Sequence, residues 1–260
     1  LQVTTSRGRY DTRLSLLRRR GDSLSLALRL FPPPEKRLSL TEIALLPEAA
    51  FRLHRLASRK QGLLLFCGPT GSGKSTTVHA LLRPQADAGR RVVTMEDPVE
   101  QREERFLQLD MRKSSDRHLI LEAALRQDPD ILFLGEVRSN ETAAYAVEAA
   151  LTGHLVLTTL HASSVSGAVD RLLELGVEAS ALVQALAGVV GQRLLQAVVP
   201  AEEGYRQVAL LEILDLTKSP FDGKELTGPW WRSFLSRTGY LGFREYREHL
   251  REAGYDIADA

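Results

Sequence analysis

The sequence predicts an α/β protein whose core is a parallel, doubly wound sheet with helices on both faces. From Gly62 onward, short apolar runs alternate with stretches of helical spacing, which is the pattern of repeated strand and helix units. Each apolar run ends in a polar segment, as expected when ligand-binding residues follow the carboxyl ends of parallel strands. We expect strands at residues 63–67, 92–95, 131–134 and 155–160.

The composition is that of a globular chain and restricts its partners. Of the 260 residues, 43% are hydrophobic and 26% are charged, which suffices for one large domain with a smaller appendage. The formal net charge of +1 does not call for nucleic acid or an anionic membrane as a partner. No apolar run reaches the roughly 18–20 residues of a spanning helix, and no signal-peptide pattern is visible. With the lone Cys67, these features predict a cytosolic chain, and because Leu1 stands in a structured segment we expect residues upstream.

The elements before Gly62 are expected to be a hairpin, a linker and a helix. Residues 9–31 contain two alternating apolar pieces around the turn-like sequence RRRGD, which indicates a β-hairpin. Three prolines within residues 32–40 favour an extended connector, and we place a domain boundary there. Residues 46–60 have helical spacing and end before the glycine.

The later elements follow from the same spacing arguments. Helices are expected at residues 74–82, 117–127, 141–151, 167–176 and 181–196. Residues 207–214 are expected to form a short strand. The tail, residues 218–260, has helical spacing in 243–255, and its Trp230 and Trp231 either pack in the core or dock a partner.

The segment GPTGSGKS, residues 68–75, has the spacing G-x-x-x-x-G-K-S between an expected strand and an expected helix. Its glycines let backbone N–H groups turn toward phosphates, the Lys74 amine reaches the terminal phosphates, and the Ser75 hydroxyl ligates Mg²⁺. A chance glycine loop imitates only part of this pattern. We therefore predict that Gly68, Pro69, Thr70, Gly71, Ser72, Gly73, Lys74, Ser75 and Thr76 bind a nucleoside triphosphate, with ATP as the expected one.

Three carboxylates follow the second strand, in TMEDPVE, where Pro98 prevents the strand from continuing. Glu96 and Asp97 are expected to organise Mg²⁺, partly through water, and Glu100 to help orient the attacking water. Carboxylates suit these roles because catalysis of phosphoryl transfer depends on positioning the metal ion and the water more than on covalent bonds to the protein. The alternative is a solvated turn.

The third strand ends in GEVRS, where Glu136 is the first candidate for polarising or positioning the attacking water. Many ATPases with this phosphate loop carry Asp directly before this glutamate, whereas this chain has Gly135. Metal coordination is therefore expected to depend more on Ser75 and residues 96–100. An ion pair between Glu136 and Arg138 is the alternative role.

Two histidines flank the fourth strand. His161 stands at the crevice end and is expected to contact the γ-phosphate. His154 stands at the far end, where it ties neighbouring elements together or has only a structural role. The remaining histidines, His54, His79, His118 and His249, are expected to be structural.

These motifs, in this order, resemble those of the secretion ATPases of type II secretion and type IV pilus systems. Four stretches look like the Walker A motif, the aspartate box, an atypical Walker B motif with Gly before Glu, and the histidine box of that family. They are GPTGSGKSTT, EDPVE, LRQDPDILFLGEVRSNETA and ALTGHLVLTTLHASS. The similarity covers nearly everything from Arg9 to about residue 217.

The resemblance implies a RecA-like ATPase domain joined by a short linker to a small α+β PAS-like N-terminal domain, assembled as hexameric rings. The corresponding ranges are the end of the PAS-like domain at 1–31, the linker at 32–40, the ATPase domain at 41–217 and a helical tail at 218–260. It also implies that Arg13 and Arg29 reach phosphates when the domains close, where a late-arriving cation stabilises transition-state charge. An ordinary charged strand face is the alternative for these arginines.

Two departures place the chain within the family. Ser139 stands where the family usually has Asp. After GQRLL, where many members carry a paired-cysteine zinc module, the sequence has no cysteine and no ligand cluster, so zinc is excluded there. The chain looks closest to the competence-pilus assembly ATPases of Gram-positive bacteria (ComGA-like).

The function that this resemblance implies is a Mg²⁺-dependent, ATP-hydrolysing homo-hexamer that is peripheral to the cytoplasmic membrane at its inner face. There it would drive a membrane platform protein and pilin assembly, for DNA uptake or secretion. The nearest alternatives are a type II secretion ATPase and a pilus-retraction ATPase. A RecA-like nucleic-acid translocase is disfavoured because the sequence has no basic groove with interleaved aromatics, so no direct nucleic-acid binding is expected. A scaffold that binds nucleotide without hydrolysis is the last alternative.

Overall fold

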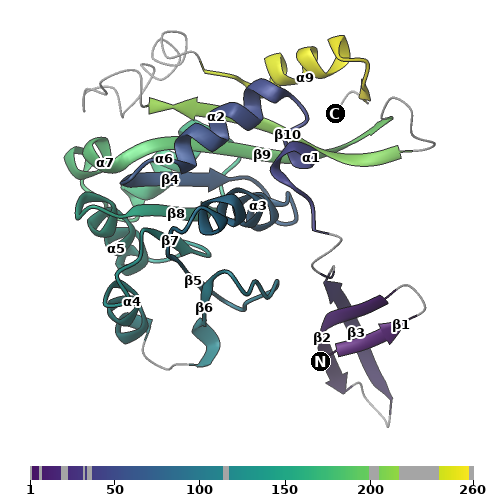
Figure 1. Cartoon of the computed structure of the whole chain (residues 1–260), viewed down its shortest axis with the longest axis horizontal. Coiled ribbons are helices and arrows are strands. Elements are labelled where there is room, and N and C mark those ends of the chain that lie inside the picture. Colours follow the sequence, from purple (N-terminus) through teal and green to yellow (C-terminus); the bar gives the residue numbers. More distant parts are fainter. Residues whose placement is uncertain are drawn as a thin grey trace.

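The computed structural model describes residues 2–5, 8–18, 23–31, 33, 37–113, 117–198, 205–216 and 240–257 (Figure 1). The strands are β1 Gln2–Thr5, β2 Gly8–Arg18, β3 Leu24–Phe31, β4 Gly62–Cys67, β5 Val92–Glu96, β6 Leu107–Asp110, β7 Ile131–Leu134, β8 Leu155–Leu160, β9 Leu186–Val198, β10 Tyr205–Asp215 and β11 Asp256–Ile257. The helices are α1 Leu40–Ile43, α2 Pro47–Ala57, α3 Lys74–Asp87, α4 Arg117–Leu125, α5 Asn140–Leu151, α6 Val165–Glu174, α7 Ala179–Ala185 and α9 Phe243–Glu252.

The larger sheet has the strand order β10-β9-β4-β8-β7-β5-β6, and β11 pairs with β9. The strands from β9 to β6 run parallel to one another, whereas β10 and β11 run antiparallel to β9. The four strands expected from apolar runs are confirmed as β4, β5, β7 and β8, which form the centre of the sheet. The expected α/β fold with a parallel sheet is therefore confirmed.

The central strand β4 shows why its sequence is uniformly apolar. All six of its residues are buried, and successive side chains point to opposite faces of the sheet. Leu63, Leu65 and Cys67 pack in one core with α4, α5, α6 and α7. Leu64 and Phe66 pack in a second core with α1, α2, α3 and α9. Figure 1 shows these two sets of helices around the sheet.

The prediction of a helix over residues 181–196 is wrong beyond residue 185, because β9 begins at Leu186. This segment inserts between β4 and β10 and makes backbone hydrogen bonds with both. Its two glycines permit a close fit: a Cβ on Gly188 would lie 2.8 Å from the Leu214 carbonyl oxygen, and one on Gly191 would lie 2.7 Å from Glu212 Oε2. The spacing of apolar residues within a segment does not reveal these neighbouring strands, since they come from distant parts of the chain.

The hairpin expected in residues 9–31 is confirmed as β2 and β3, which are antiparallel, and β1 adds a third strand to this small sheet. Figure 1 shows that the small sheet lies apart from the large one. In the register of the hairpin, Arg13 is paired directly with Arg29. The two arginines therefore project from the same face of the small sheet.

The expected helix in the tail is confirmed as α9, and it packs on β10 through buried Tyr246 and Leu250. Leu241 makes a bridge to Ile213 of β10, so this part of the tail is joined to the large sheet. Trp230 and Trp231 lie outside the described residues. Among the residues that the structure describes, no helix is long and apolar enough to cross a membrane.

Candidate active site

A cleft of about 610 Å³ lies where β4, β5, β7 and β8 end at their carboxyl termini. Residues that follow all four strands line it, together with two arginines of the small sheet. The cleft thus brings together the following candidates from the sequence: Arg13, Arg29, Thr70, Gly71, Gly73, Lys74, Ser75, Thr76, Glu96, Asp97, Glu100, Glu136 and His161. Gly68, Pro69 and Ser72 belong to the same phosphate loop but do not line the cleft.

The phosphate loop needs glycine at two positions for different reasons. Gly73 has φ +84° and forms the N-cap of α3, a backbone conformation that favours glycine. A Cβ on Gly68 would lie 2.2 Å from the Gln192 carbonyl oxygen of β9, so any larger residue would collide with backbone. The loop therefore packs tightly against β9 and presents the N-terminus of the 14-residue helix α3 to the cleft, which favours an anion.

Lys74 is buried, and its amine is held by the loop itself. Lys74 Nζ donates hydrogen bonds to the carbonyl oxygens of Gly68, at 2.8 Å, and Pro69, at 2.9 Å. Burial lowers the pKa of Lys74, and the charge of Glu136 acts in the opposite direction. The cation is thus placed in the cleft opposite a carboxylate, as expected of a group that binds terminal phosphates.

Glu96 ends β5 with its side chain turned into the protein, where three groups donate hydrogen bonds to its carboxylate. Thr94 Oγ1 and Gln108 Nε2 lie 2.7 Å and 3.3 Å from Oε1. His79 Nε2 lies 3.2 Å from Oε2. His79 itself packs edge-on against two phenylalanines, Phe106 and Phe133. The orientation of the Glu96 carboxylate is therefore determined by neighbouring side chains.

The close approach of β7 to Glu96 explains the glycine before Glu136. A Cβ on Gly135 would lie 3.1 Å from the Met95 carbonyl oxygen and 3.3 Å from Glu96 Cα. The end of β5, which carries the Glu96 carboxylate, thus lies where a side chain at position 135 would be.

Glu136 lies between two basic side chains. Arg138 Nη2 donates to its Oε2 at 2.5 Å, and His161 Nε2 lies 3.0 Å from its Oε1. The ion pair with Arg138, which the sequence left as an alternative, is therefore present within the cleft. His161 lines the cleft as expected, and its contact with a γ-phosphate stays a prediction. A carboxylate held by two donors in this way has a defined orientation for activating a water molecule.

The small sheet contributes two arginines to the lining of the cleft. Arg29 Nη1 lies 3.2 Å from Glu100 Oε1, and both side chains remain partly exposed. Arg13 lines the same cleft from the paired strand. Arg29 therefore contacts one of the carboxylates that follow β5, and the action of both arginines on phosphates stays a prediction.

The oxygen donors near the phosphate loop suit a magnesium ion. Ser75, exposed in the cleft, and Asp97 contribute a hydroxyl and a carboxylate, and Mg²⁺ commonly keeps several waters and needs few protein ligands. Because three protein groups already bond to Glu96, its carboxylate is suited to acting through water. Within the described ranges, no group of three or more His, Cys, Asp or Glu residues is arranged to hold a metal.

A comparison with family models gives a match to the "Type II/IV secretion system protein" family over residues 1–224. The chain belongs to this family. A putative type II secretion system protein E of Escherichia coli is 45% identical over 175 residues, which is 66% of this chain and 36% of that protein. The competence protein ComGA of Bacillus subtilis is 41% identical over 165 residues, 62% of this chain and 46% of that protein. The chain therefore spans less than half the length of either relative.

Solved structures of secretion and pilus ATPases share the fold. The ATPase DotB of Legionella pneumophila has a TM-score of 0.81 and 26% identity, covering 100% of this chain and 74% of that protein. The pilus retraction motor PilT, solved with bound ADP, has a TM-score of 0.78 and 26% identity over the same shares. The resemblance found in the sequence motifs is therefore confirmed, as is the mostly parallel α/β fold.

Three further residues of this family member acquire clear roles in the structure. Gln192 of β9 is buried, and its Nε2 donates to the Ser72 carbonyl oxygen of the phosphate loop at 2.7 Å. The sequence analysis did not single out Gln192, because residues 181–196 were expected to form a helix and a polar residue in a helix does not by itself indicate a buried contact. Ser139 is the N-cap of α5 and accepts from the Thr142 N–H. His154 lies away from the cleft, with Nδ1 3.2 Å from the Ala149 carbonyl oxygen.

Proposed function

We propose that the chain is the ATP-hydrolysing part of a hexameric motor that powers assembly of a competence pseudopilus or type IV pilus, for DNA uptake or protein secretion. The observation that carries the proposal is the single cleft that gathers Lys74, the carboxylates Glu100 and Glu136, and arginines from a second sheet. Relatives named for type II secretion and competence support this class of machine.

The residues of the cleft divide the chemistry between them. The loop around Lys74 binds the terminal phosphates, and Ser75 with Asp97 holds Mg²⁺. Bound MgATP supplies the γ-phosphoryl group that is transferred to water. Glu136, oriented by Arg138 and His161, accepts the proton of the attacking water.

Arg13 and Arg29 contribute to the reaction from the small sheet. Their charges offset the negative charge that develops during phosphoryl transfer. Because these arginines belong to a different sheet from the phosphate loop, the placement of the two sheets controls how much charge reaches the site. This dependence is how hydrolysis would be coupled to movement of the two parts.

The partners follow from the class of machine. We propose that the motor is peripheral to the cytoplasmic membrane at its inner face and acts on a membrane platform protein that receives pilins. Type II secretion and pilus retraction remain the second candidates, since relatives include secretion proteins and a solved neighbour is a retraction motor.

The decisive experiment is steady-state ATP hydrolysis as a function of protein concentration, with size-exclusion chromatography of the same samples. Turnover per chain should rise steeply as a ring forms and should be lost when Mg²⁺ is chelated. Glu136→Gln should bind ATP yet lose about 100-fold or more in kcat, the size typical of losing a general base. Lys74→Ala is the binding control and should fail to bind a fluorescent ATP analogue.

Near-normal turnover in Glu136→Gln would transfer the water-positioning role to Glu100 and leave the ATPase function unchanged. Two outcomes would contradict the proposal itself. Binding without turnover at any concentration would favour the scaffold. Turnover that rises on adding DNA would favour a nucleic-acid translocase.

A further inference from the structure

A buried ion pair joins the connector after the small sheet to the loop after β5. Arg37 Nη1 lies 3.2 Å from Glu103 Oε2, and the two side chains are only 7% and 6% exposed. Burying two charges costs desolvation free energy that their attraction offsets only with good geometry, so such a pair is a weak source of net stability. Its location, between the connector and a loop that lines the cleft, indicates another role.

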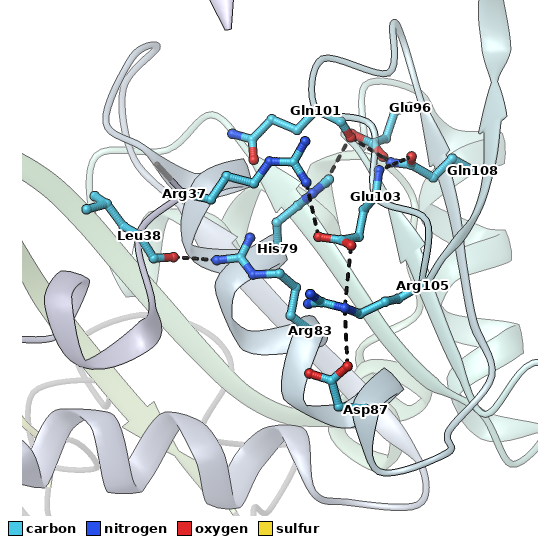
Figure 2. A network of polar contacts seen from close by, with 10 residues as sticks. All are labelled: Arg37, Leu38, His79, Arg83, Asp87, Glu96, Gln101, Glu103, Arg105 and Gln108. Atoms are coloured by element: carbon cyan, nitrogen blue, oxygen red, sulfur yellow. Dashed lines mark hydrogen bonds and ion pairs between the residues drawn. The ribbon is translucent and has the colours of Figure 1, made fainter. Parts of the chain in front are cut away.

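A second step leads from this pair to Glu96 (Figure 2). The backbone N–H of Glu103 donates to Gln108 Oε1 at 2.7 Å. The amide nitrogen of the same glutamine donates to Glu96 Oε1 at 3.3 Å and to the Gln101 carbonyl oxygen at 2.9 Å. Gln108 thus holds both the loop that carries Glu103 and a carboxylate at the edge of the cleft.

The connector is also tied to α3, the helix that begins at the phosphate loop. Arg83 of α3 donates to the carbonyl oxygen of Leu38, the residue after Arg37. Arg105 lies between Asp87, at the end of α3, and Glu103, with Nε to oxygen distances of 3.2 Å and 3.7 Å. Figure 2 shows the contacts of Arg37, Arg105 and Gln108 with Glu103, and beside them the separate bond between Arg83 and Leu38.

We propose that Arg37 and Glu103 are positioning residues, which transmit the placement of the connector to Glu96 through Gln108. This inference rests on the proposed ATPase function. If Arg37 moves away with the small sheet, Glu103 loses its nearer cation and keeps only the longer pair with Arg105, so part of its buried charge is no longer compensated and its loop must shift. Gln108 then loses its bond from the Glu103 N–H, and Glu96 loses the orientation given by one of its three donors.

Two single variants and their combination test this connection. Arg37→Met removes the charge but keeps an apolar stem, and Gln108→Leu breaks the step to Glu96 without touching the ion pair. Each should lower kcat by about 10-fold or more, within the range for a misplaced catalytic group, while the affinity for a fluorescent ATP analogue changes by less than about 3-fold. Because both changes interrupt one route, the double variant should lose no more than the more severe single variant.

A second readout needs no nucleotide. In the free protein, hydrogen exchange of the backbone amides in residues 97–106 should be faster in Arg37→Met than in the wild type, because the Glu103 N–H bond to Gln108 is weakened. Arg37→Lys, which keeps the charge, should restore much of both kcat and protection. Arg171→Met is the matched control: it removes an exposed ion pair with Glu174 on α6 and should leave kcat and exchange unchanged.

The outcomes separate this inference from the function on which it rests. A wild-type chain that binds ATP without turnover overturns the proposed function. Normal wild-type turnover, with unchanged kcat and unchanged exchange in Arg37→Met, overturns the inference alone. Losses of kcat that multiply in the double variant also overturn it, since two independent effects would then be acting.

Discussion

Adding one methyl group at Gly135 is a sharp test of the packing between β5 and β7. Gly135 has no left-handed φ, so alanine introduces no backbone strain there and acts through contact alone. The new Cβ would lie 3.1 Å from the Met95 carbonyl oxygen and 3.3 Å from Glu96 Cα. Both neighbours are backbone atoms of a buried strand, which cannot turn away as a flexible side chain does.

The expected cost follows from two opposing effects. Inserting a methyl group into a well-packed site costs about 1–3 kcal/mol. Replacing glycine restricts the unfolded chain and recovers about 0.4–1 kcal/mol of that. A net loss of about 1–2 kcal/mol corresponds to a Tm lower by roughly 2–8 °C for a chain near this size. Since the displaced backbone carries Glu96, kcat should fall as well.

Thermal unfolding and urea unfolding measure the stability of Gly135→Ala, and ATP hydrolysis measures kcat. The matched control is Gly167→Ala in α6, where the new Cβ would meet only the Ser164 hydroxyl at 3.3 Å and a distant methyl group. That control should be neutral or stabilising, because alanine favours a helix over glycine. Wild-type Tm and wild-type kcat in Gly135→Ala would refute the argument that β5 fills this space.

Two further predictions concern charge. Arg29→Ala should slow turnover by roughly 10-fold or more, a small part of what a transition-state arginine supplies. Its exposed pair with Glu100 is worth only about 0–1 kcal/mol, so Tm and ATP affinity should hardly change; unaltered kcat would leave Arg29 as a structural residue. Burial raises the pKa of Glu212, so folding favours the protonated form of this side chain. The free energy of unfolding that this preference contributes is present below the unfolded pKa of about 4.3 and is lost as the pH rises through the folded pKa. In Glu212→Gln the amide oxygen still accepts the hydrogen bond from the Val165 N–H. Urea unfolding should therefore give this variant the stability of the wild type near pH 4 and a higher stability than the wild type at pH 7–8. A difference in stability that does not change with pH would contradict this prediction.

The central strands were predictable because their signal is local. A strand buried on both faces is mostly apolar, and β4, β7 and β8 lie within a residue of the expected ends. The two buried threonines of β8, Thr158 and Thr159, donate hydrogen bonds from their hydroxyls to carbonyl oxygens at the end of β7. The phosphate loop was predictable for a similar reason, since its glycines and Lys74 are adjacent in the chain. The helices α3 and α5 likewise begin within a residue of the expected starts.

Other features depend on partners that the local sequence does not contain. β9 resembles a helical segment until β4 and β10 are placed on its two sides. The role of Gln192 depends on a carbonyl oxygen 120 positions away, at Ser72. The expectation for His79 was a structural one, and only the packed structure shows that it orients Glu96.

The sequence by itself determined the parallel sheet, the phosphate loop and the edge at which Glu96, Glu136 and His161 meet, because strand direction places the carboxyl ends of parallel strands together. Only the tertiary structure decided how those groups are held. Glu136 is oriented by His161 and Arg138, and Glu96 is connected through Gln108 to an ion pair between residues 66 positions apart. The physical reason is that hydrogen bonds and ion pairs depend on distances of a few ångströms, which are set by packing between segments and not by the order of residues along the chain.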